Sequence, residues 1–543
     1  MTQDRVDPSL RSELMQGNST AVKSAQSWET LLVQPMDEFN QQLVANVHPA
    51  DWRNPEPHGV YNLVVIGAGT AGLVCAAIAA GLGAKVALIE RHLMGGDCLN
   101  VGCVPSKGVL RASRVWALMK QADRFGISYP PGVKYDFGAV MRRMRQLRAV
   151  LSQMDSARRF AALGVDLYLG TGTFLNMNQI CVEGPAGSRT LTFAKAVICT
   201  GGRAAAPAIP GLQDAGFLTN ETVFSLTELP ESLAVIGAGP IGCELAQAFA
   251  RFGSRVHLIE ALHGILPRED RDAAEVVRQA LVHDGVTVLC CGTDLIVSRT
   301  PHGKRLLVNS HGRQHDLVVQ EILVGVGRSP NVEGLGLEHA GVKADHTGVL
   351  VNDRLQTTNP RIFAAGDICS PYKFTHAAEA MAQLVIQNAL FPHPFGIGYA
   401  SLRSLIIPWC TYTDPEIAHV GWYEHEARQH GVEVETVTVP LREVDRAVLD
   451  GEDQGFARIH VKKGTDKIVG ATIVASHAGD LLSEITLAMR TGAGLRAIAN
   501  TIHPYPTQAE VLKKAAYAWR KSTLTPTKKR ILTALFAWLR RTR

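Results

Sequence analysis

Two cysteines separated by four residues carry the clearest potential for chemistry in this chain. They lie in the stretch Gly-Gly-Asp-Cys-Leu-Asn-Val-Gly-Cys-Val-Pro-Ser-Lys, residues 95–107. A structural zinc site needs about four ligands at close spacing, and no second cysteine or histidine pair lies nearby. A purely structural disulfide is typical of secreted chains, and the charged N-terminus lacks the apolar core of a signal peptide. We therefore interpret Cys98 and Cys103 as a redox pair.

The backbone around this pair must be irregular. Pro105 suits a first helical turn, so we expect a helix to begin near it, and its N-terminal field would lower the pKa of a nearby thiol. Residues five apart in a regular helix are ~8 Å apart, whereas a disulfide requires Cα atoms ~4.4–6.8 Å apart. Gly102 is the residue that can absorb the necessary distortion.

The element that positions the pair is a dinucleotide-binding unit directly before it, residues 63–90. A β-branched run leads into Gly67-Ala-Gly69-Thr-Ala-Gly72, followed by an alanine-rich helix and a second strand that ends at Glu90. The glycines permit a tight turn, the approach of a pyrophosphate and close packing of helix on strand, and the acid is placed to bind a ribose. Residues 62–84 contain no charged side chain and so have the length and composition of a membrane span. The dinucleotide-binding unit explains this uncharged segment better.

The same unit recurs at residues 233–260, with Gly237, Gly239 and Gly242 in identical spacing and Glu260 at the end. Two dinucleotide sites indicate electron transfer between two dinucleotides, of which a flavin and a nicotinamide are the usual pair. An acid at position 260 without an arginine directly after it favours NADH over NADPH, although Arg268 is within reach in the sequence.

Composition sets the class of protein. The chain has 543 residues, 46% of them hydrophobic, and a net charge of +5, so we expect several folded domains and no nucleic-acid partner. Ten cysteines are ordinary for this length, and Cys75, Cys181, Cys199 and Cys243 have the apolar neighbours of reduced core residues. We expect a cytoplasmic location.

The cysteine stretch resembles the redox signature of the class I pyridine nucleotide-disulfide oxidoreductases, which include lipoamide dehydrogenase, glutathione reductase and mercuric reductase. Residues 196–202, 324–331, 362–368 and 412–421 are similar to further markers of this family in the same order. The resemblance implies FAD and NAD(P)H as cofactors and covers about residues 61–520. It implies FAD contacts from Gly67, Gly69, Gly72, Glu90, Gly96, Lys107, Thr200, Gly201 and Asp367, and NAD(P) contacts from Gly237, Gly239, Gly242, Glu260 and Gly327.

The resemblance also assigns roles to the reactive residues. Cys103 is expected to be the flavin-side sulfur and Cys98 the thiol that meets the substrate. Lys107 adds positive charge near the flavin, and Glu244 looks like the acid that pairs with this lysine. The expected assembly is a homodimer in which Tyr505 and Glu510 face the partner subunit's Cys98.

The C-terminal site departs from part of the family. Residues 503–510 read His-Pro-Tyr-Pro-Thr-Gln-Ala-Glu, which puts Tyr505 where lipoamide and glutathione reductases carry a catalytic histidine. A tyrosine of pKa ~10 cannot take up a proton near neutrality as an imidazole of ~6.5 can. Tyr505 resembles the mercuric reductase branch, which reduces a thiophilic metal such as Hg(II). The alternatives are a dihydrolipoyl dehydrogenase with an unusual proton donor, with His503 reaching the site as one way to supply it, and a flavoprotein retained as a scaffold.

Further expectations concern features outside this site. The chain lacks the C-terminal cysteine pair with which mercuric reductases capture Hg(II). Cys290-Cys291, its one vicinal pair, is expected to be buried in a strand of the nicotinamide domain, with a metal-shuttling role as the alternative. The Trp28, Leu31, Leu32, Phe39 and Leu43 spacing predicts a helical arm. A basic amphipathic helix over residues 521–543 is expected to dock on its own domain, with peripheral membrane contact as the alternative.

The resulting fold class is α/β, with two Rossmann-like dinucleotide-binding domains, for FAD and NAD(P), and a C-terminal α/β dimerisation domain. The expected divisions are an N-terminal extension at 1–60, FAD-binding segments at 61–210 and 340–394, an NAD(P)-binding domain at 211–339, an interface domain at 395–520 and a tail at 521–543.

Overall fold

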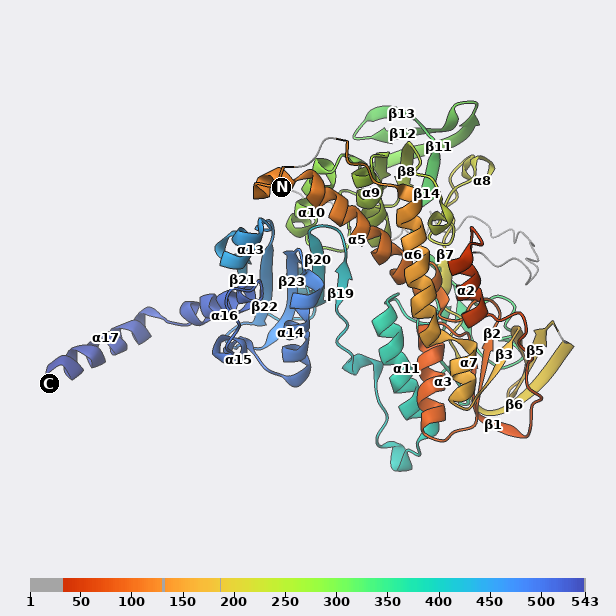
Figure 1. Ribbon diagram of the computed structural model, residues 1–543. Coiled ribbons are helices and arrows are strands. Elements are labelled where there is room, and N and C mark those ends of the chain that lie inside the picture. Colours follow the sequence, from red (N-terminus) through yellow and green to blue (C-terminus); the bar gives the residue numbers. More distant parts are fainter. Residues whose placement is uncertain (1–32, 129–131, 186, 542–543) are drawn as a thin grey trace. The chain divides into compact units, whose positions relative to one another are not determined.

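The computed structural model describes residues 33–128, 132–185 and 187–541. Its described residues divide into two compact units, one formed by those up to 263 together with 285–405, and the other by 264–284 together with those from 406 onward. Each unit is an α/β assembly of its own (Figure 1). Trp28, Leu31 and Leu32 of the expected arm lie outside the described residues.

The first unit is built on a seven-stranded sheet. The strands are β1 (Val60–Ile66), β2 (Val86–Glu90), β3 (Val165–Leu169), β4 (Thr171–Asn176), β5 (Gln179–Gly184), β6 (Gly187–Ile198) and β18 (Ile362–Ala364). β3, β2, β1, the end of β6 and β18 run parallel, with Ile66 opposite Ile198 and Ile198 opposite Ala364. The loops after β1, β6 and β18 therefore meet at one edge, because parallel strands end on the same side of a sheet.

The uncharged stretch at residues 62–84 forms most of strand β1 and the whole of one helix, α3. The helices of this part are α2 (Glu38–Val47), α3 (Thr70–Gly81), α4 (Gly96–Asn100), α5 (Cys103–Lys120), α6 (Phe137–Leu151), α7 (Ala157–Ala162) and α11 (Thr375–Leu390). α11 lies along α3 (Figure 1). None of the helices that the structure describes has both the length and the apolar composition needed to cross a membrane.

The described part of the N-terminal arm confirms the helical prediction. α2 packs on α6, with Leu43 completely buried. Its cap residue Asp37 forms an ion pair with Arg145, with 2.6 Å between Oδ2 and Nε.

A second parallel sheet, in the order β10-β9-β8-β14, completes the first unit. The elements around it are β7 (Gly202–Ala204), α8 (Leu212–Ala215), β8 (Ser232–Ile236), α9 (Pro240–Phe252), β9 (Arg255–Ile259), β10 (Thr287–Leu289), β11 (Gly292–Thr300), β12 (Gly303–Ser310), β13 (Arg313–Val319), β14 (Glu321–Val324), β15 (Arg328–Pro330), β16 (Ala344–Asp345) and β17 (Gly348–Val349). The antiparallel strands β11, β12 and β13 form a separate three-stranded sheet. Each of the two glycine turns thus follows the first strand of its own parallel sheet, as the repeated motif predicts.

The second unit has a five-stranded antiparallel sheet in the order β19-β20-β23-β22-β21. Its elements are α10 (Arg271–His283), β19 (Trp409–Thr411), β20 (Glu416–Gly421), α12 (Glu424–Gln429), β21 (Val434–Pro440), α13 (Asp445–Asp450), β22 (Phe456–Lys462), β23 (Ile468–Ala475), α14 (Ala478–Thr491), α15 (Leu495–Asn500), α16 (Glu510–Ser522) and α17 (Pro526–Arg541). The apolar face of α16 packs into the core through Val511, Leu512 and Trp519.

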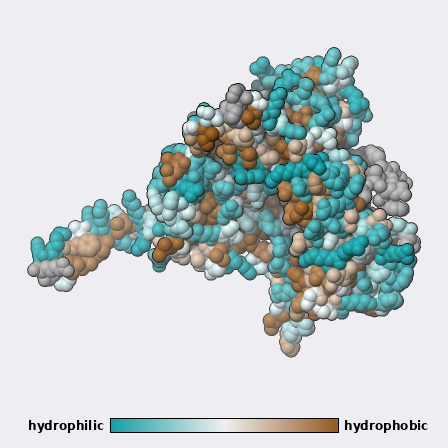
Figure 2. Space-filling view, viewed as in Figure 1, coloured by the Kyte–Doolittle hydropathy of each residue, from teal (hydrophilic) through white to brown (hydrophobic). Residues whose placement is uncertain are grey.

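Three expectations about burial are wrong. No described residue of α17 is buried, so the tail does not dock on its own domain, and Figure 2 shows apolar and hydrophilic surface side by side on it. Cys290 and Cys291 are half-buried, because β10 already ends at Leu289 and both cysteines lie on its connection to β11. Cys181 on β5 is also half-buried, whereas Cys75, Cys199 and Cys243 are buried as predicted.

Candidate active site

The two cysteines of the redox stretch lie on either side of a break between two helices. Cys98 is in α4, whereas Cys103 is the first residue of α5, two residues before Pro105. Gly102 forms the break with φ −128° and ψ −113°, and a Cβ atom there would lie 2.7 Å from the carbonyl oxygen of Asp97. The predicted distortion and its assignment to Gly102 are both confirmed.

The surroundings of the pair favour a thiolate at Cys103. A hydrogen bond from the Cys98 thiol lowers the pKa of Cys103 most, and the Thr375 hydroxyl and the charge of Lys107 lower it further against the effect of burial, to about 6. Sharing its proton with Cys103 raises the pKa of Cys98. Thr375 Oγ1, at the start of α11, lies 3.4 Å from Cys103 Sγ. The reactive form at neutral pH is thus the Cys103 thiolate.

Lys107 forms an ion pair with Glu244, as expected. Its Nζ donates to Glu244 Oε2 at 2.8 Å, and the side chains are 38% and 5% exposed respectively. Glu244 lies in the second turn of α9. The Lys107–Glu244 ion pair therefore joins α5, which begins at Cys103, to the second dinucleotide unit.

A shallow hollow of about 370 Å³ opens beside Cys103 between α5 and α6. Its lining includes apolar groups such as Leu147 and the cationic side chains of Lys107, Arg111 and Arg143. Cys103 thus borders an open space lined by positively charged side chains, and positive charge nearby helps to stabilise a thiolate.

The first glycine turn is shaped as the motif predicts. A Cβ at Gly72 would lie 1.8 Å from the carbonyl oxygen of Gly67, and one at Gly96 would lie 2.7 Å from the Cα of Gly69. Glu90 accepts hydrogen bonds from the backbone N–H groups of Ala68 and His92, both at 2.7 Å. Since each carboxylate oxygen has two lone pairs, Glu90 can hold the turn and still accept a ribose hydroxyl.

The second glycine turn repeats this arrangement. A Cβ at Gly242 would lie 1.9 Å from the carbonyl oxygen of Gly237, while one at Gly239 would meet no protein atom within 4 Å. Packing therefore requires Gly242 but not Gly239, and the open space at Gly239 suits a dinucleotide that approaches the backbone. Glu260 accepts from Ala238 N at 2.8 Å and from Leu262 N at 3.0 Å.

The remaining predicted cofactor residues gather at the edges of these sheets. Thr200 donates its hydroxyl to the carbonyl oxygen of Asn331 at 2.9 Å, and Asn331 N donates to Gly201 O at 3.0 Å. Gly327, with φ +140°, directly precedes β15, which pairs with β7. The loop after β6 and the loop after β14 are thus fastened together.

Asp367 lies in the loop after β18 and pairs with Arg328, with 3.2 Å between Oδ2 and Nε. Burial raises the pKa of Asp367. Arg328 also forms an ion pair with Asp97, the residue before Cys98. Arg328 therefore connects the cysteine segment to the Asp367 loop.

The C-terminal residues lie in the second unit. The Tyr505 side chain is 70% exposed, and its hydroxyl donates to Asp445 Oδ2 at 3.0 Å. This hydrogen bond, with a smaller effect from Glu510, raises the pKa of Tyr505. His503 is held differently, because its Nε2 contacts Glu484 Oε1 at 3.1 Å and its side chain is only 5% exposed.

Sequence reasoning missed two side chains of this site. Thr375 contacts Cys103 and Arg328 contacts Asp97 and Asp367. Arg328 lies in the stretch 324–331 that resembles a family marker, but the residue type alone does not indicate that Asp97 and Asp367 are its partners. Thr375 has no local signal.

Comparisons with known proteins agree with this geometry. Residues 61–383 match the family model described as pyridine nucleotide-disulphide oxidoreductase, and residues 407–516 match the dimerisation domain of that family. The chain is 34% identical to a mercuric reductase of Staphylococcus aureus, over 85% of this chain and 83% of the relative. It is also 34% identical to a dihydrolipoyl dehydrogenase of Chlamydia muridarum, over 84% of this chain and 96% of that relative.

Among solved structures, the chain is similar to the Cu(II) complex of the HOCl-induced flavoprotein disulfide reductase RclA from Escherichia coli. The TM-score is 0.74 at 27% identity, and the match covers 85% of this chain and 100% of the other. LpdA from Mycobacterium tuberculosis matches with a TM-score of 0.75 at 26% identity, over 85% of this chain and 100% of the other.

Proposed function

The chain belongs to the pyridine nucleotide-disulphide oxidoreductase family, and we propose that it uses NAD(P)H to reduce a thiophilic metal ion such as Hg(II) at Cys98 and Cys103. The family is FAD-dependent. The observation that carries the proposal is the Cys103 thiol, hydrogen-bonded to the Cys98 thiol and contacted by Thr375. Tyr505 in place of a catalytic histidine directs the choice of substrate.

The residues present suit FAD. Gly67, Gly69 and Gly72 would hold its pyrophosphate and Glu90 its ribose. The first glycine turn has no room for side chains at Gly72 and Gly96, which keeps this turn close to the backbone shape that the motif needs. By resemblance to the family, Asp367 would contact the ribityl chain. Gly237, Gly239, Gly242 and Glu260 would hold NAD(P)H in the same manner. When bound, the two cofactors supply the electrons that reduce the disulfide.

The chain's own residues prepare the thiols for the substrate. Thr375 and Lys107 stabilise the Cys103 thiolate, and Glu244 holds Lys107 in place. Cys98 keeps the proton of the reduced pair. A thiophilic ion takes up that proton's place by binding to both sulfurs, because a coordinated thiol is deprotonated. The Cys98 proton goes to solvent when the ion binds, and the two sulfurs then give the ion two electrons, so that Hg(II) leaves as Hg(0) and the Cys98–Cys103 disulfide forms again.

The C-terminal residues support a metal ion over a disulfide as the acceptor. A disulfide substrate leaves as thiolates that need protons from a general acid with a pKa near the working pH. Tyr505 has a pKa raised by Asp445, and His503 is buried against Glu484. A metal ion held by thiolates needs no such acid.

The second candidate is a dihydrolipoyl dehydrogenase-type activity. Dihydrolipoyl dehydrogenases match as closely in identity as mercuric reductases do. The contact of 3.1 Å between His503 and Glu484 is the observation in its favour, because a carboxylate beside an imidazole is the arrangement that orients a catalytic histidine.

Steady-state oxidation of NADH by the purified FAD-loaded enzyme separates the two activities. We expect Hg(II), and Cu(II) as a second thiophilic ion, to support turnover in the presence of excess small thiol, with lipoamide and glutathione disulfide much slower. A Cys98→Ser variant controls for direct oxidation of the flavin. Faster turnover with lipoamide than with Hg(II) would assign the enzyme to the dihydrolipoyl dehydrogenase type.

The proposal extends to the assembly of the enzyme. The match to the dimerisation domain of the family suggests a homodimer, and we propose that Tyr505 and Glu510 face the partner subunit's Cys98.

We also propose that α17 binds an anionic membrane surface. Its apolar side chains are exposed, as are the cations at positions 528–530 and 540–541, and such a helix gains from both apolar burial and charge attraction.

A further inference from the structure

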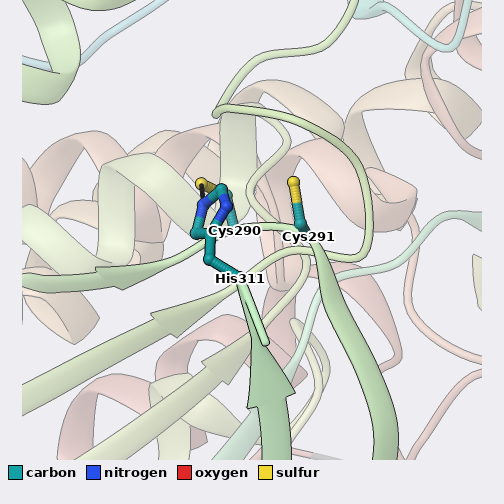
Figure 3. Close-up of side chains that lie close together, drawn as sticks. All are labelled: Cys290, Cys291 and His311. Atoms are coloured by element: carbon teal, nitrogen blue, oxygen red, sulfur yellow. Dashed lines mark hydrogen bonds between the residues drawn. The ribbon is translucent and has the colours of Figure 1, made fainter. Parts of the chain in front are cut away.

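Two adjacent cysteines and two histidines lie together in the first unit, on loops outside the redox pair. Cys290 and Cys291 connect β10 to β11, His311 is in the turn between β12 and β13, and His263 is in the loop after β9. The ligand atoms of Cys290, Cys291 and His311 all lie within 4.8 Å of one another. Figure 3 shows His311 beside Cys290, with Cys291 on the same connection.

The four side chains form two sulfur–nitrogen pairs. Cys290 Sγ lies 3.2 Å from His311 Nε2, and Cys291 Sγ lies 3.3 Å from His263 Nδ1. The two imidazole rings are 6.2 Å apart, edge to face. In a tetrahedral zinc site with Zn–S ≈ 2.3 Å and Zn–N ≈ 2.0 Å, a ligand sulfur and nitrogen are about 3.5 Å apart. Each pair is therefore close to the spacing of two zinc ligands, and His263, which contacts Cys291 but lies outside the group of three, would turn toward that group to share the ion.

The backbone holds these side chains in place. Cys291 N donates to Leu262 O at 3.0 Å, next to His263, and Ser310 Oγ donates to Cys290 O at 2.6 Å, next to His311. Cys291 and His311 also have left-handed φ values of +54° and +51°. Non-glycine residues adopt this conformation at an energetic cost, and such residues concentrate at functional sites.

The cluster is also accessible. Cys290 and Cys291 are half-buried, and His263 and His311 are exposed, so an ion can reach all four from solvent. Two thiols and two imidazoles are the ligand set of a structural Cys₂His₂ zinc site. Soft and borderline ions such as zinc prefer these ligands to carboxylates.

We propose that Cys290, Cys291, His311 and His263 bind one metal ion of the zinc class. Binding releases the two thiol protons to solvent and leaves both histidines neutral, with no change of oxidation state. The ion would join the β10–β11 connection and the β12–β13 turn to the loop that follows Glu260, whose carboxylate accepts from Leu262 N at 3.0 Å. The site is independent of the proposed reductase function.

Equilibrium dialysis of the full-length chain against Zn(II), with bound metal measured by mass spectrometry, tests the proposal. Cys98→Ser and Cys103→Ser are present throughout, so that the redox pair does not contribute thiol ligands. We expect about one ion per chain, as in a closed zinc site. Cys290→Ser and Cys291→Ser should each weaken binding by more than the ~10–100-fold typical of a change outside the ligand shell.

Cys181→Ser is the matched control, because Cys181 is also half-buried but lies on β5. It should bind zinc as the parent does. Absence of a stoichiometric ion in the parent, or equal binding in the Cys290→Ser/Cys291→Ser double variant, overturns the proposal. Loading the parent with Co(II) gives a second readout that does not depend on how the variants fold. Absorbance bands of tetrahedral thiolate coordination are expected, and bands of an octahedral ion overturn the proposal.

Discussion

Replacement of Thr375 by valine removes the hydroxyl that contacts Cys103 and keeps the shape of the side chain. A hydrogen bond to a charged group contributes about 1.5–3 kcal/mol, and one pKa unit corresponds to about 1.36 kcal/mol. The contact between Thr375 Oγ1 and Cys103 Sγ is 3.4 Å long, so we take the lower end of this range. The pKa of Cys103, about 6 in the native protein, should therefore rise by about one unit.

The assay is the pH dependence of alkylation of Cys103 by iodoacetamide in the reduced protein, followed by mass spectrometry of the peptide. Because only the thiolate reacts, a pKa shift from about 6 to about 7 lowers the reactive fraction at neutral pH from about 90% to about 50%. Thr375→Ser keeps the hydroxyl and should leave the midpoint unchanged. The reasoning fails if Thr375→Val leaves the midpoint where it is, or if the serine variant shifts it equally.

Four further outcomes are expected. Lys107→Met should also raise the pKa of Cys103, because a nearby positive charge is lost. It should lower the free energy of unfolding by about 1–2 kcal/mol, since Glu244 loses its partner while the lysine itself is partly exposed. Thermal unfolding measures this change. Tyr505→His should raise lipoamide turnover by about 100-fold, the effect of one general acid, with Hg(II) turnover unchanged. NADH should be preferred to NADPH in kcat/KM, and Glu260→Gln should reduce this preference by about tenfold, the loss of one hydrogen bond to a charged group. Deletion of α17 should abolish sedimentation with anionic vesicles, and sedimentation of the intact chain with neutral vesicles would count against charge attraction.

The dinucleotide units could be predicted because their constraints are local. Within about 30 residues, the turn, the helix and the terminal acid each demand particular residue types, and the contacts of Gly67 with Gly72 and of Gly237 with Gly242 show why. The break at Gly102 followed from a conflict between helix geometry and disulfide geometry. Such arguments need no knowledge of the rest of the fold.

The misses concern what lies beside a segment in space. Thr375 is 272 residues from Cys103 in the chain, and no local pattern announces the contact. The stripe of α17 predicted an amphipathic helix correctly, but periodicity does not say whether the apolar face meets its own domain. Cys290 and Cys291 follow an apolar strand, and the sequence does not reveal that the strand ends one residue before them.

The N-terminal arm bears on how the cysteine segment keeps its shape. Arg148 of α6 is 2% exposed and donates to Asn100 O at 2.5 Å, between the two cysteines, and to Asn40 Oδ1 of α2 at 2.6 Å. Its pKa is lowered by burial to about 10, so it stays charged at neutral pH. A chain truncated so that it begins at β1 would lose Asn40 and leave the guanidinium of Arg148 beside an unfilled space. The arm therefore stabilises the backbone between Cys98 and Cys103, and an enzyme that lacks the arm should lose order at these two thiols before it loses its fold.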